Sequence, residues 1–262
     1  MYKKIVTHRK PDLDACLSVW AAQCLYGDTN GELPVEFVPA NFNDPEEDVL
    51  YVDLTCGIKE PKPGMCASAF LISELDKPIS EAMAFVSQYI NKIDIGKLTS
   101  EERIYSTRNP TFQTTVNALK EVSPDIVVIR VMNTIFDGIL EMGLKEQRAK
   151  ELAQAAEWID DVVIIRQNPN DKNLIFGVER FLYKKPTAIV TQIGMNLGVK
   201  LTYGSKVDLN NLVLPERESW FIHPAGFMAQ WGDLSGKSAK AKLPAPISPY
   251  DLAKKVNELI LK

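Results

Sequence analysis

A histidine and two aspartates lie within seven residues near the start of the chain. The segment His8-Arg9-Lys10-Pro11-Asp12-Leu13-Asp14 directly follows the apolar run Ile5-Val6-Thr7. An imidazole with two carboxylates suits a divalent ion of intermediate hardness, Mn²⁺ first, with Mg²⁺, Fe²⁺, Co²⁺ or Zn²⁺ as alternatives. The simpler interpretation is a surface histidine followed by two aspartates that cap a helix.

The flanking sequence predicts how these side chains are positioned. A strand that begins near Lys4 would place His8 at its C-terminal end, where open parallel sheets gather their ligands. A helix from about Pro11 to Leu25 would follow, because proline suits the first helical turn and aspartate favours the positive end of the helix dipole. We therefore expect Asp12 and Asp14 beside His8.

The rest of the chain alternates strands with helices, which predicts an α/β fold with two lobes. The first lobe should hold a mostly parallel sheet flanked by helices, and the second should be a smaller α/β domain. We expect a metal-binding domain over 1–125, a connecting helix within 126–160 and a substrate-binding domain over 161–262. The expected strands are 34–39, 49–53, 162–165, 188–193, 199–203 and 220–222, and the further helices are 80–92, 111–119, 126–159 and 249–261.

The first motif resembles that of the DHH phosphoesterase superfamily, which reads His-x-x-Pro-Asp-x-Asp after the first strand. All of its fixed positions are present in residues 8–14. The resemblance implies a two-metal centre that hydrolyses phosphoester bonds and a second aspartate at the end of a later strand. Asp53 is the candidate for that catalytic, metal-bridging role. The alternative is that Asp53 caps the turn at residues 55–57.

Two later segments resemble the melanocyte proliferating-gene family of DHH-like hydrolases, some of which are nucleases. Asp94 occupies the place of that family's Asp-Asn-Gly element, just beyond the expected helix, and is then a further metal ligand. Residues 220–228 resemble Phe-Val-His-Ala-x-Gly-Phe-Ile, which implies that His223 and Gly226 contact substrate across the cleft and that His223 is catalytic. A turn aspartate and a structural histidine are the alternatives.

The chain departs from the superfamily in the motif that gives it its name. Its two histidines are His8 and His223, so Asp-His-His is absent, and the corresponding place reads Gly64-Met65-Cys66-Ala67-Ser68. A thiolate from Cys66 is one replacement for the missing imidazole, suited to Zn²⁺ or Fe²⁺ and poorly matched to Mn²⁺. The alternative is a small core residue.

Composition constrains the partners. A net charge of −4 does not indicate nucleic acid, although it leaves that substrate open, and a small phosphorylated or nucleotide-like substrate fits at least as well. Arg108 and Lys237 are candidates to contact a substrate phosphate, with a solvated surface role as the alternative. No apolar run approaches the roughly 20 residues that span a bilayer, and no signal-peptide pattern is evident, so we expect a cytoplasmic protein without a membrane partner. A homodimer is a possible assembly.

Two functions follow from these observations. The leading hypothesis is a metal-dependent phosphoesterase in which His8, Asp12, Asp14, Asp53 and Asp94 hold Mn²⁺ or Mg²⁺ and metal-bound water attacks phosphorus. The alternative is a catalytically degenerate relative that binds a nucleotide or phosphorylated ligand without hydrolysis, and the missing Asp-His-His motivates it.

Overall fold

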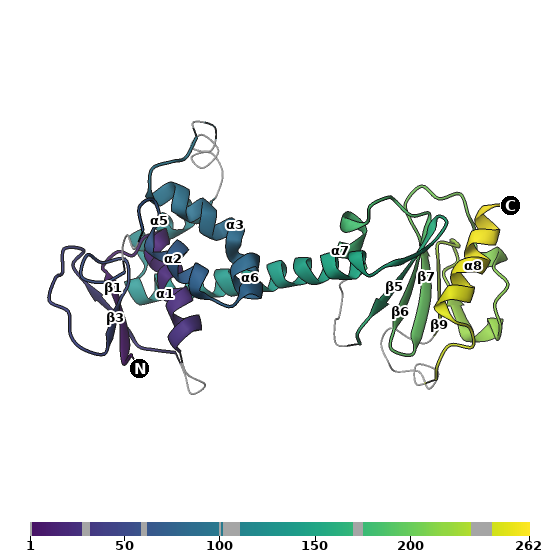
Figure 1. Cartoon of the computed structure of the whole chain (residues 1–262), viewed down its shortest axis with the longest axis horizontal. Coiled ribbons are helices and arrows are strands. Elements are labelled where there is room, and N and C mark those ends of the chain that lie inside the picture. The colour runs from purple at the N-terminus through teal and green to yellow at the C-terminus, as the bar shows by residue number, and fades with distance from the viewer. Residues whose placement is uncertain are drawn as a thin grey trace. The chain divides into compact units, whose positions relative to one another are not determined.

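The chain forms two compact units, Met1–Leu144 and Lys145–Lys262, both built from strands and helices (Figure 1). The computed structural model describes residues 2–27, 32–58, 62–99, 101, 111–169, 175–231 and 243–262. The predicted α/β class, with a parallel N-terminal sheet and a second α/β lobe, is confirmed. Helix α6, Asp125–Gln154, contains the boundary between the two units.

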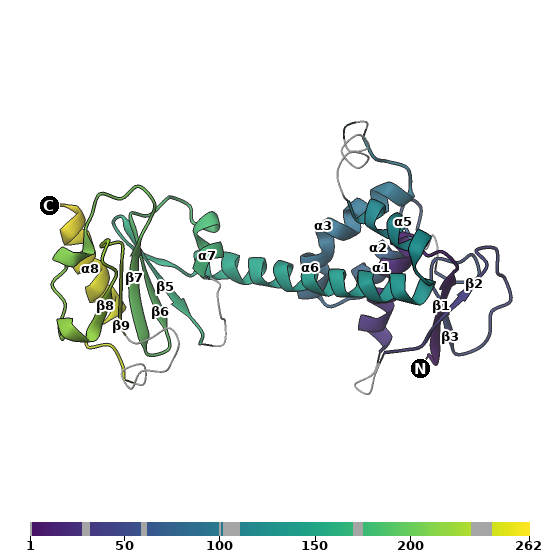
Figure 2. The same cartoon turned by 180° about the vertical axis from the view of Figure 1, so that it is seen from behind.

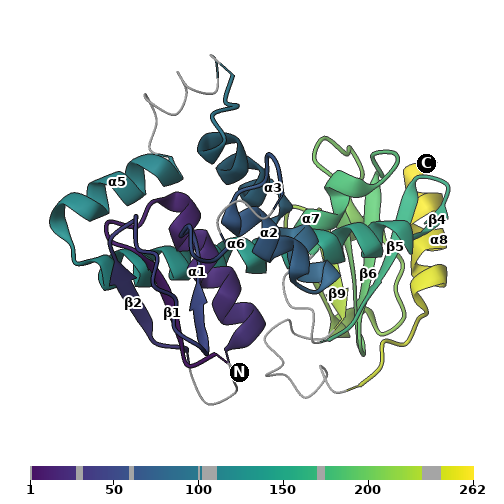
Figure 3. The ribbon, with the colours of Figure 1, turned by 60° about the vertical axis from the view of Figure 1, so that its left-hand side comes forward.

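The first unit is organised around a parallel sheet in the order β2-β1-β3. Its strands are β1 (Lys4–His8), β2 (Val35–Val38) and β3 (Val49–Tyr51). Because side chains alternate along a strand, Ile5 and Leu50 enter the main core while Val6 and Tyr51 join a small cluster on the other face. The main core is completed by α1 (Leu13–Tyr26), α2 (Ala67–Glu74), α3 (Lys77–Asp94), α5 (Phe112–Val122) and the start of α6 (Figure 3).

Several predicted helix boundaries are wrong. Helix α1 begins at Leu13 rather than Pro11, because the extended backbone of Asp12 makes it the N-cap, whose side chain accepts a hydrogen bond from Ala15 N–H. Helix α3 ends at Asp94, so this residue belongs to the helix and does not follow it. Helix α2 was not predicted at all.

The second unit contains a mixed sheet in the order β4-β5-β6-β7-β9-β8. Strands β5 and β6 pair in parallel, and the other neighbours in this order are antiparallel. Helix α8 covers the face that includes Val162, whereas α7 and the end of α6 cover the face that includes Val163 (Figure 2). The elements are β4 (Glu157–Ile159), β5 (Val162–Gln167), α7 (Ile175–Val178), η1 (Glu179–Phe181), β6 (Ala188–Ile193), β7 (Asn196–Leu201), η2 (Leu209–Asn211), η3 (Arg217–Ser219), β8 (Trp220–Ile222), β9 (Met228–Trp231) and α8 (Pro249–Ile260).

Two predictions in the second unit are corrected. The long helix stops at Gln154, because residues 157–159 pair with β5 across a tight turn in which Asp160 has φ 49°. Strand β7 begins at Asn196 rather than Val199, and β9 was not predicted. Within the described ranges, no helix is both long and apolar enough to cross a membrane.

Candidate metal centre

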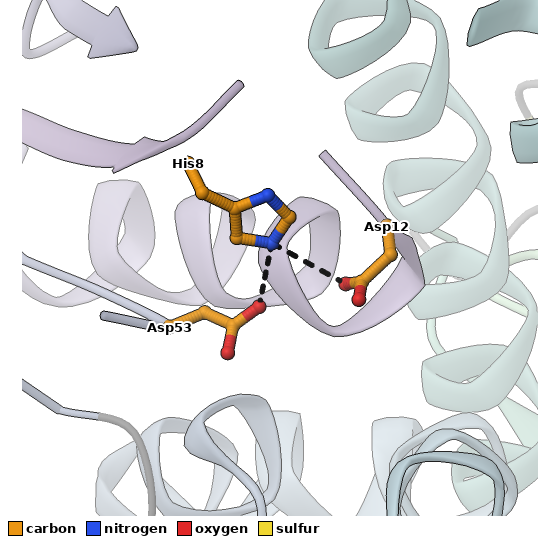
Figure 4. Close-up of side chains that lie close together, drawn as sticks. All are labelled: His8, Asp12 and Asp53. Atoms are coloured by element: carbon orange, nitrogen blue, oxygen red, sulfur yellow. Dashed lines mark hydrogen bonds and ion pairs between the residues drawn. The ribbon is translucent and has the colours of Figure 1, made fainter. Parts of the chain in front are cut away.

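The first group of ligand-type side chains gathers at the C-terminal edge of the parallel sheet. His8 ends β1, Asp12 caps α1 and Asp53 follows β3. The Nε2 atom of His8 lies 3.0 Å from Oδ2 of Asp53 and 3.9 Å from Oδ1 of Asp12 (Figure 4). One donor atom from each residue lies within 4.8 Å of the others. We call these three residues triad one.

The imidazole of His8 is oriented by its own backbone neighbour. Its Nδ1–H donates to the carbonyl oxygen of Arg9 at 3.0 Å, which directs Nε2 toward the carboxylates. This is the arrangement by which metal-binding histidines are commonly fixed. The hydrogen bond to Asp53 raises the pKa of His8 to about 9, although burial opposes the shift. Without a metal, a proton on His8 therefore partly neutralises the carboxylates.

A tight loop presents Asp53 to His8. Asp53 has φ 53°, its N–H donates to the carbonyl of Ile58 at 2.7 Å, and Ile58 N–H returns a bond to Tyr51 at 3.0 Å. A Cβ at Gly57 would overlap the Tyr51 backbone, so glycine is required for the loop to close this tightly. A left-handed conformation at a non-glycine residue costs on the order of 1 kcal/mol and is often retained at functional sites. In this geometry the Asp53 carboxylate contacts His8.

A second group, which we call triad two, consists of Asp14, Cys66 and Asp94, with one donor atom of each within 4.8 Å of the others. They come from the first turn of α1, the N-cap of α2 and the last turn of α3. Asp14 accepts hydrogen bonds from the N–H groups of Ser68 at 3.0 Å and Ala67 at 3.3 Å. Its carboxylate thus lies at the positive end of the α2 dipole.

The charges of the two triads interact. Asp14 is 3% exposed, and burial, followed by repulsion from Asp53, raises its pKa to about 6. Burial also raises the pKa of Asp53, with Asp12 and Asp94 adding repulsion and the hydrogen bond from His8 opposing it. A divalent cation would relieve this repulsion, since it supplies the largest local charge in such a site. The donor atoms therefore fit a metal centre in type, spacing and charge.

Cys66 is the residue that the sequence offers as a replacement for the missing imidazole. The residue is fully buried, and its Sγ is 3.5 Å from the Ser68 hydroxyl oxygen. Burial and the nearby Asp14 raise the pKa of the thiol to about 12, so the metal-free protein carries a protonated sulfur at neutral pH. Asn91, which the sequence did not single out, accepts a hydrogen bond from Cys66 N–H at 2.8 Å.

His223 and Gly226 form a shaped turn between β8 and β9 in the second unit. His223 Nδ1 accepts from Ala225 N–H at 3.2 Å, and its ring lies 4.1 Å from that of Phe227. Gly226 has φ 65°, and a Cβ there would overlap Oδ1 of Asp208. That this turn contacts substrate stays a prediction. Arg108 and Lys237 lie outside the described residues.

Three solved structures resemble the chain at low identity. A pGpG-specific phosphodiesterase, PggH from Vibrio cholerae, is 11% identical with a TM-score of 0.31, covering 100% of this chain and 98% of that one. An uncharacterised Helicobacter pylori G27 protein is 8% identical with a TM-score of 0.28, covering 98% and 99%. Exonuclease RecJ bound to manganese is 11% identical with a TM-score of 0.30, covering 95% and 94%. No family model and no curated protein matches the chain.

Proposed function

We propose that this protein is a metal-dependent phosphoesterase that hydrolyses a phosphodiester or phosphomonoester bond of a nucleotide-like substrate. The observation that carries the proposal is the pair of adjacent ligand triads, one of them at the C-terminal edge of a parallel sheet. Divalent ions held there, Mn²⁺ first and Mg²⁺ as the alternative, would supply an activated water and stabilise the charge that develops on phosphate. The resemblance of residues 8–14 to the DHH motif points the same way.

The side chains of the two triads would bind different ions. His8 and Asp12 would hold one ion, and Asp14 and Asp94 the other. Asp53 would be the ligand shared by both, since its Oδ2 contacts His8 (Figure 4) and its charge also acts on Asp14 and Asp94 of the other triad. Burial, with repulsion from nearby carboxylates added to it, raises the pKa of Asp14 and of Asp53, so each carboxylate is more stable when a cation or a proton accompanies it. A phosphate would be repelled by the same carboxylates until cations are bound.

Hydrolysis by the metal-stripped full chain, reloaded with Mn²⁺ or Mg²⁺, tests the proposal. Suitable probes are bis(p-nitrophenyl) phosphate, p-nitrophenyl phosphate and a dinucleotide panel that includes pGpG. We expect metal-dependent turnover that falls by about 100-fold or more in Asp53→Asn, because the variant weakens a ligand shared by both positions. Asp48→Asn is the matched control, since Asp48 also has a positive φ, 60°, but lies outside both triads.

The outcomes separate the alternatives. Full activity in Asp53→Asn would contradict the assignment of the site. Stabilisation of the metal-loaded protein by a probe that it does not hydrolyse would count against the enzyme and favour the non-catalytic ligand-binding relative.

A further inference from the structure

The two triads differ in the chemistry of their donor atoms. Triad one offers nitrogen and oxygen, whereas triad two offers a sulfur atom between two carboxylates. Oxygen ligands suit Mn²⁺ and Mg²⁺, whereas a thiolate favours Zn²⁺, Co²⁺ and Fe²⁺. The two positions are therefore unequal in the metals that they should prefer.

Cys66 has the surroundings of a ligand rather than of a core residue. Cys16 and Cys66 are both fully buried, but among the described residues the main apolar core includes Cys16 and not Cys66. The sulfur of Cys66 lies instead among Asp14, Asp94 and the hydroxyl of Ser68. A thiol that only fills space would be expected against apolar atoms.

The start of α2 leaves the sulfur directed at the carboxylates. Cys66 is the N-cap of this helix, yet among the described residues its side chain makes no capping hydrogen bond. Asp14, which lies in α1, supplies the cap instead, because its carboxylate accepts hydrogen bonds from the N–H groups of Ala67 and Ser68. The helix is thus capped without using Cys66, and the thiol is not needed to complete the backbone hydrogen bonds.

Asn91 fixes Cys66 relative to the third member of the triad. Its Oδ1 accepts from Cys66 N–H at 2.8 Å, and its Nδ2 donates to the carbonyl of Gly64 at 3.3 Å. Asn91 precedes Asp94 by three residues in α3, a spacing that places both on one helix face. Asn91 is therefore a positioning residue that links the loop before α2 to the helix face carrying Asp94.

We propose that Cys66 is a thiolate ligand and that triad two is a sulfur-containing metal position that selects Zn²⁺ over Mn²⁺ and Mg²⁺. The inference rests on the metal centre proposed above. When the metal–sulfur bond forms, the S–H bond breaks and its proton leaves to solvent, with no change of oxidation state. Triad one, which lacks sulfur, keeps the preference for Mn²⁺ or Mg²⁺.

Cobalt absorption tests the proposal without any measurement of activity. The metal-stripped full chain is titrated with Co²⁺, and the near-ultraviolet sulfur-to-cobalt charge-transfer band is recorded. We expect the band in the wild-type protein and in Cys16→Ser, and its loss in Cys66→Ser. Zn²⁺ should abolish the band at equimolar concentration while Mn²⁺ leaves it, and Asn91→Ala should weaken Co²⁺ binding at this position by about 10-fold.

A second measurement covers the case in which Cys66→Ser does not fold. X-ray absorption of the wild-type protein loaded with one equivalent of Zn²⁺ should show a sulfur neighbour at about 2.3 Å. Co²⁺ binding without the band, or a Zn²⁺ shell of nitrogen and oxygen alone, would overturn the role of Cys66 while leaving the metal centre intact. Absence of Co²⁺ and Mn²⁺ binding would overturn this inference together with the proposed function.

Discussion

Replacing Asp14 with asparagine should stabilise the metal-free protein at neutral pH while it weakens metal binding. Asp14 is 3% exposed, and burial followed by repulsion from Asp53 raises its pKa from 3.8 to about 6. Because the pKa is higher in the folded protein, the folded state prefers the protonated carboxyl. The stability that this group contributes therefore falls as pH rises from about 4 to about 6 and is lowest above that range.

The structure sets the size of the effect. A shift of about two pKa units corresponds to about 3 kcal/mol of unfolding free energy, the cost of ionising Asp14 in the folded protein. Asparagine avoids that cost but retains one acceptor oxygen for the two N–H groups of Ala67 and Ser68. An unpaired buried donor costs about 1–3 kcal/mol. We expect Asp14→Asn to be about 1 kcal/mol more stable near pH 7.5 and about 2 kcal/mol less stable near pH 4.

Urea unfolding in the presence of a chelator measures this crossover, with hydrogen exchange of the α1 and α2 amides to report on the first unit alone. The exposed Asp44 provides the control variant Asp44→Asn, whose difference from the wild type should be small at every pH. A stability difference between Asp14→Asn and the wild type that does not change with pH would refute the reasoning. At a Zn²⁺ concentration about 100 times the wild-type Kd, Zn²⁺ should stabilise the wild type by about 2.7 kcal/mol and the variant by less, because Asp14 belongs to triad two.

Three further outcomes follow from the geometry. Gly57→Ala should lower the unfolding free energy by about 2 kcal/mol, because the added Cβ would overlap the β3 backbone. Gly138→Ala should raise it by about 0.5–1 kcal/mol, because Gly138 lies in α6 with open space around it. Urea titration compares the two variants. The Mn²⁺ affinity measured by calorimetry should rise about tenfold per pH unit above about pH 7 and level off near pH 9. The reason is that Mn²⁺ must displace the proton of His8, whose pKa is raised to about 9. An affinity that does not change with pH would contradict this. Gly226→Ala should destabilise the second unit by about 2 kcal/mol, visible as faster hydrogen exchange in β9, because a positive φ and the Asp208 carboxylate both oppose a side chain there; unchanged exchange would count against that strain.

The parts of the fold that sequence predicts well are those with local signals. Strand β1 is marked by an apolar run, and the start of α1 by Pro11 and Asp12 just before the helix and Asp14 in its first turn, so the placement of His8 near Asp12 follows from a few neighbouring residues. The approach of Asp53 follows from topology, because neighbouring parallel strands end at the same edge of a sheet. The left-handed backbone conformation of Asp53, which turns its side chain toward His8, depends on hydrogen bonds in the loop up to Ile58. The residue type at position 53 does not predict this conformation.

Helix α2 shows why the second triad could not be derived in the same way. Residues 67–74 are short and largely apolar, so they carry no helical periodicity to detect, and their capping group is Asp14, more than fifty residues earlier in the chain. Without α2, Cys66 could be predicted only as a replacement for the missing imidazole or as a small core residue, and its proximity to Asp14 and Asp94 did not follow from the sequence.

The predicted end of the long helix α6 was wrong for the opposite reason, because here the helical periodicity extended beyond the helix. Apolar residues at helical spacing continue through Ile159, but Trp158 and Ile159 suit a strand equally well. Pairing with β5 decides for the strand. Periodicity reports which side chains are buried, whereas the partner that buries them is set by tertiary structure.

The two triads also differ in what a single substitution can reveal. His8 and Asp12 lie four residues apart, so two members of triad one are placed by β1 and α1, and the third, Asp53, is placed by the neighbouring strand β3. Triad two is assembled from three helices, and its members are held together by Asp14 at the start of α2 and by Asn91 on α3. Substitutions that shift α2 should therefore disturb the second metal position and leave the first intact. Asn91→Ala is the clearest case, because it removes the hydrogen bond between the Cys66 backbone and α3 while every ligand side chain stays in the sequence. Mn²⁺ affinity should be retained while Co²⁺ affinity at the sulfur-containing position falls, and an equal loss of both would show that the two positions are not structurally separate.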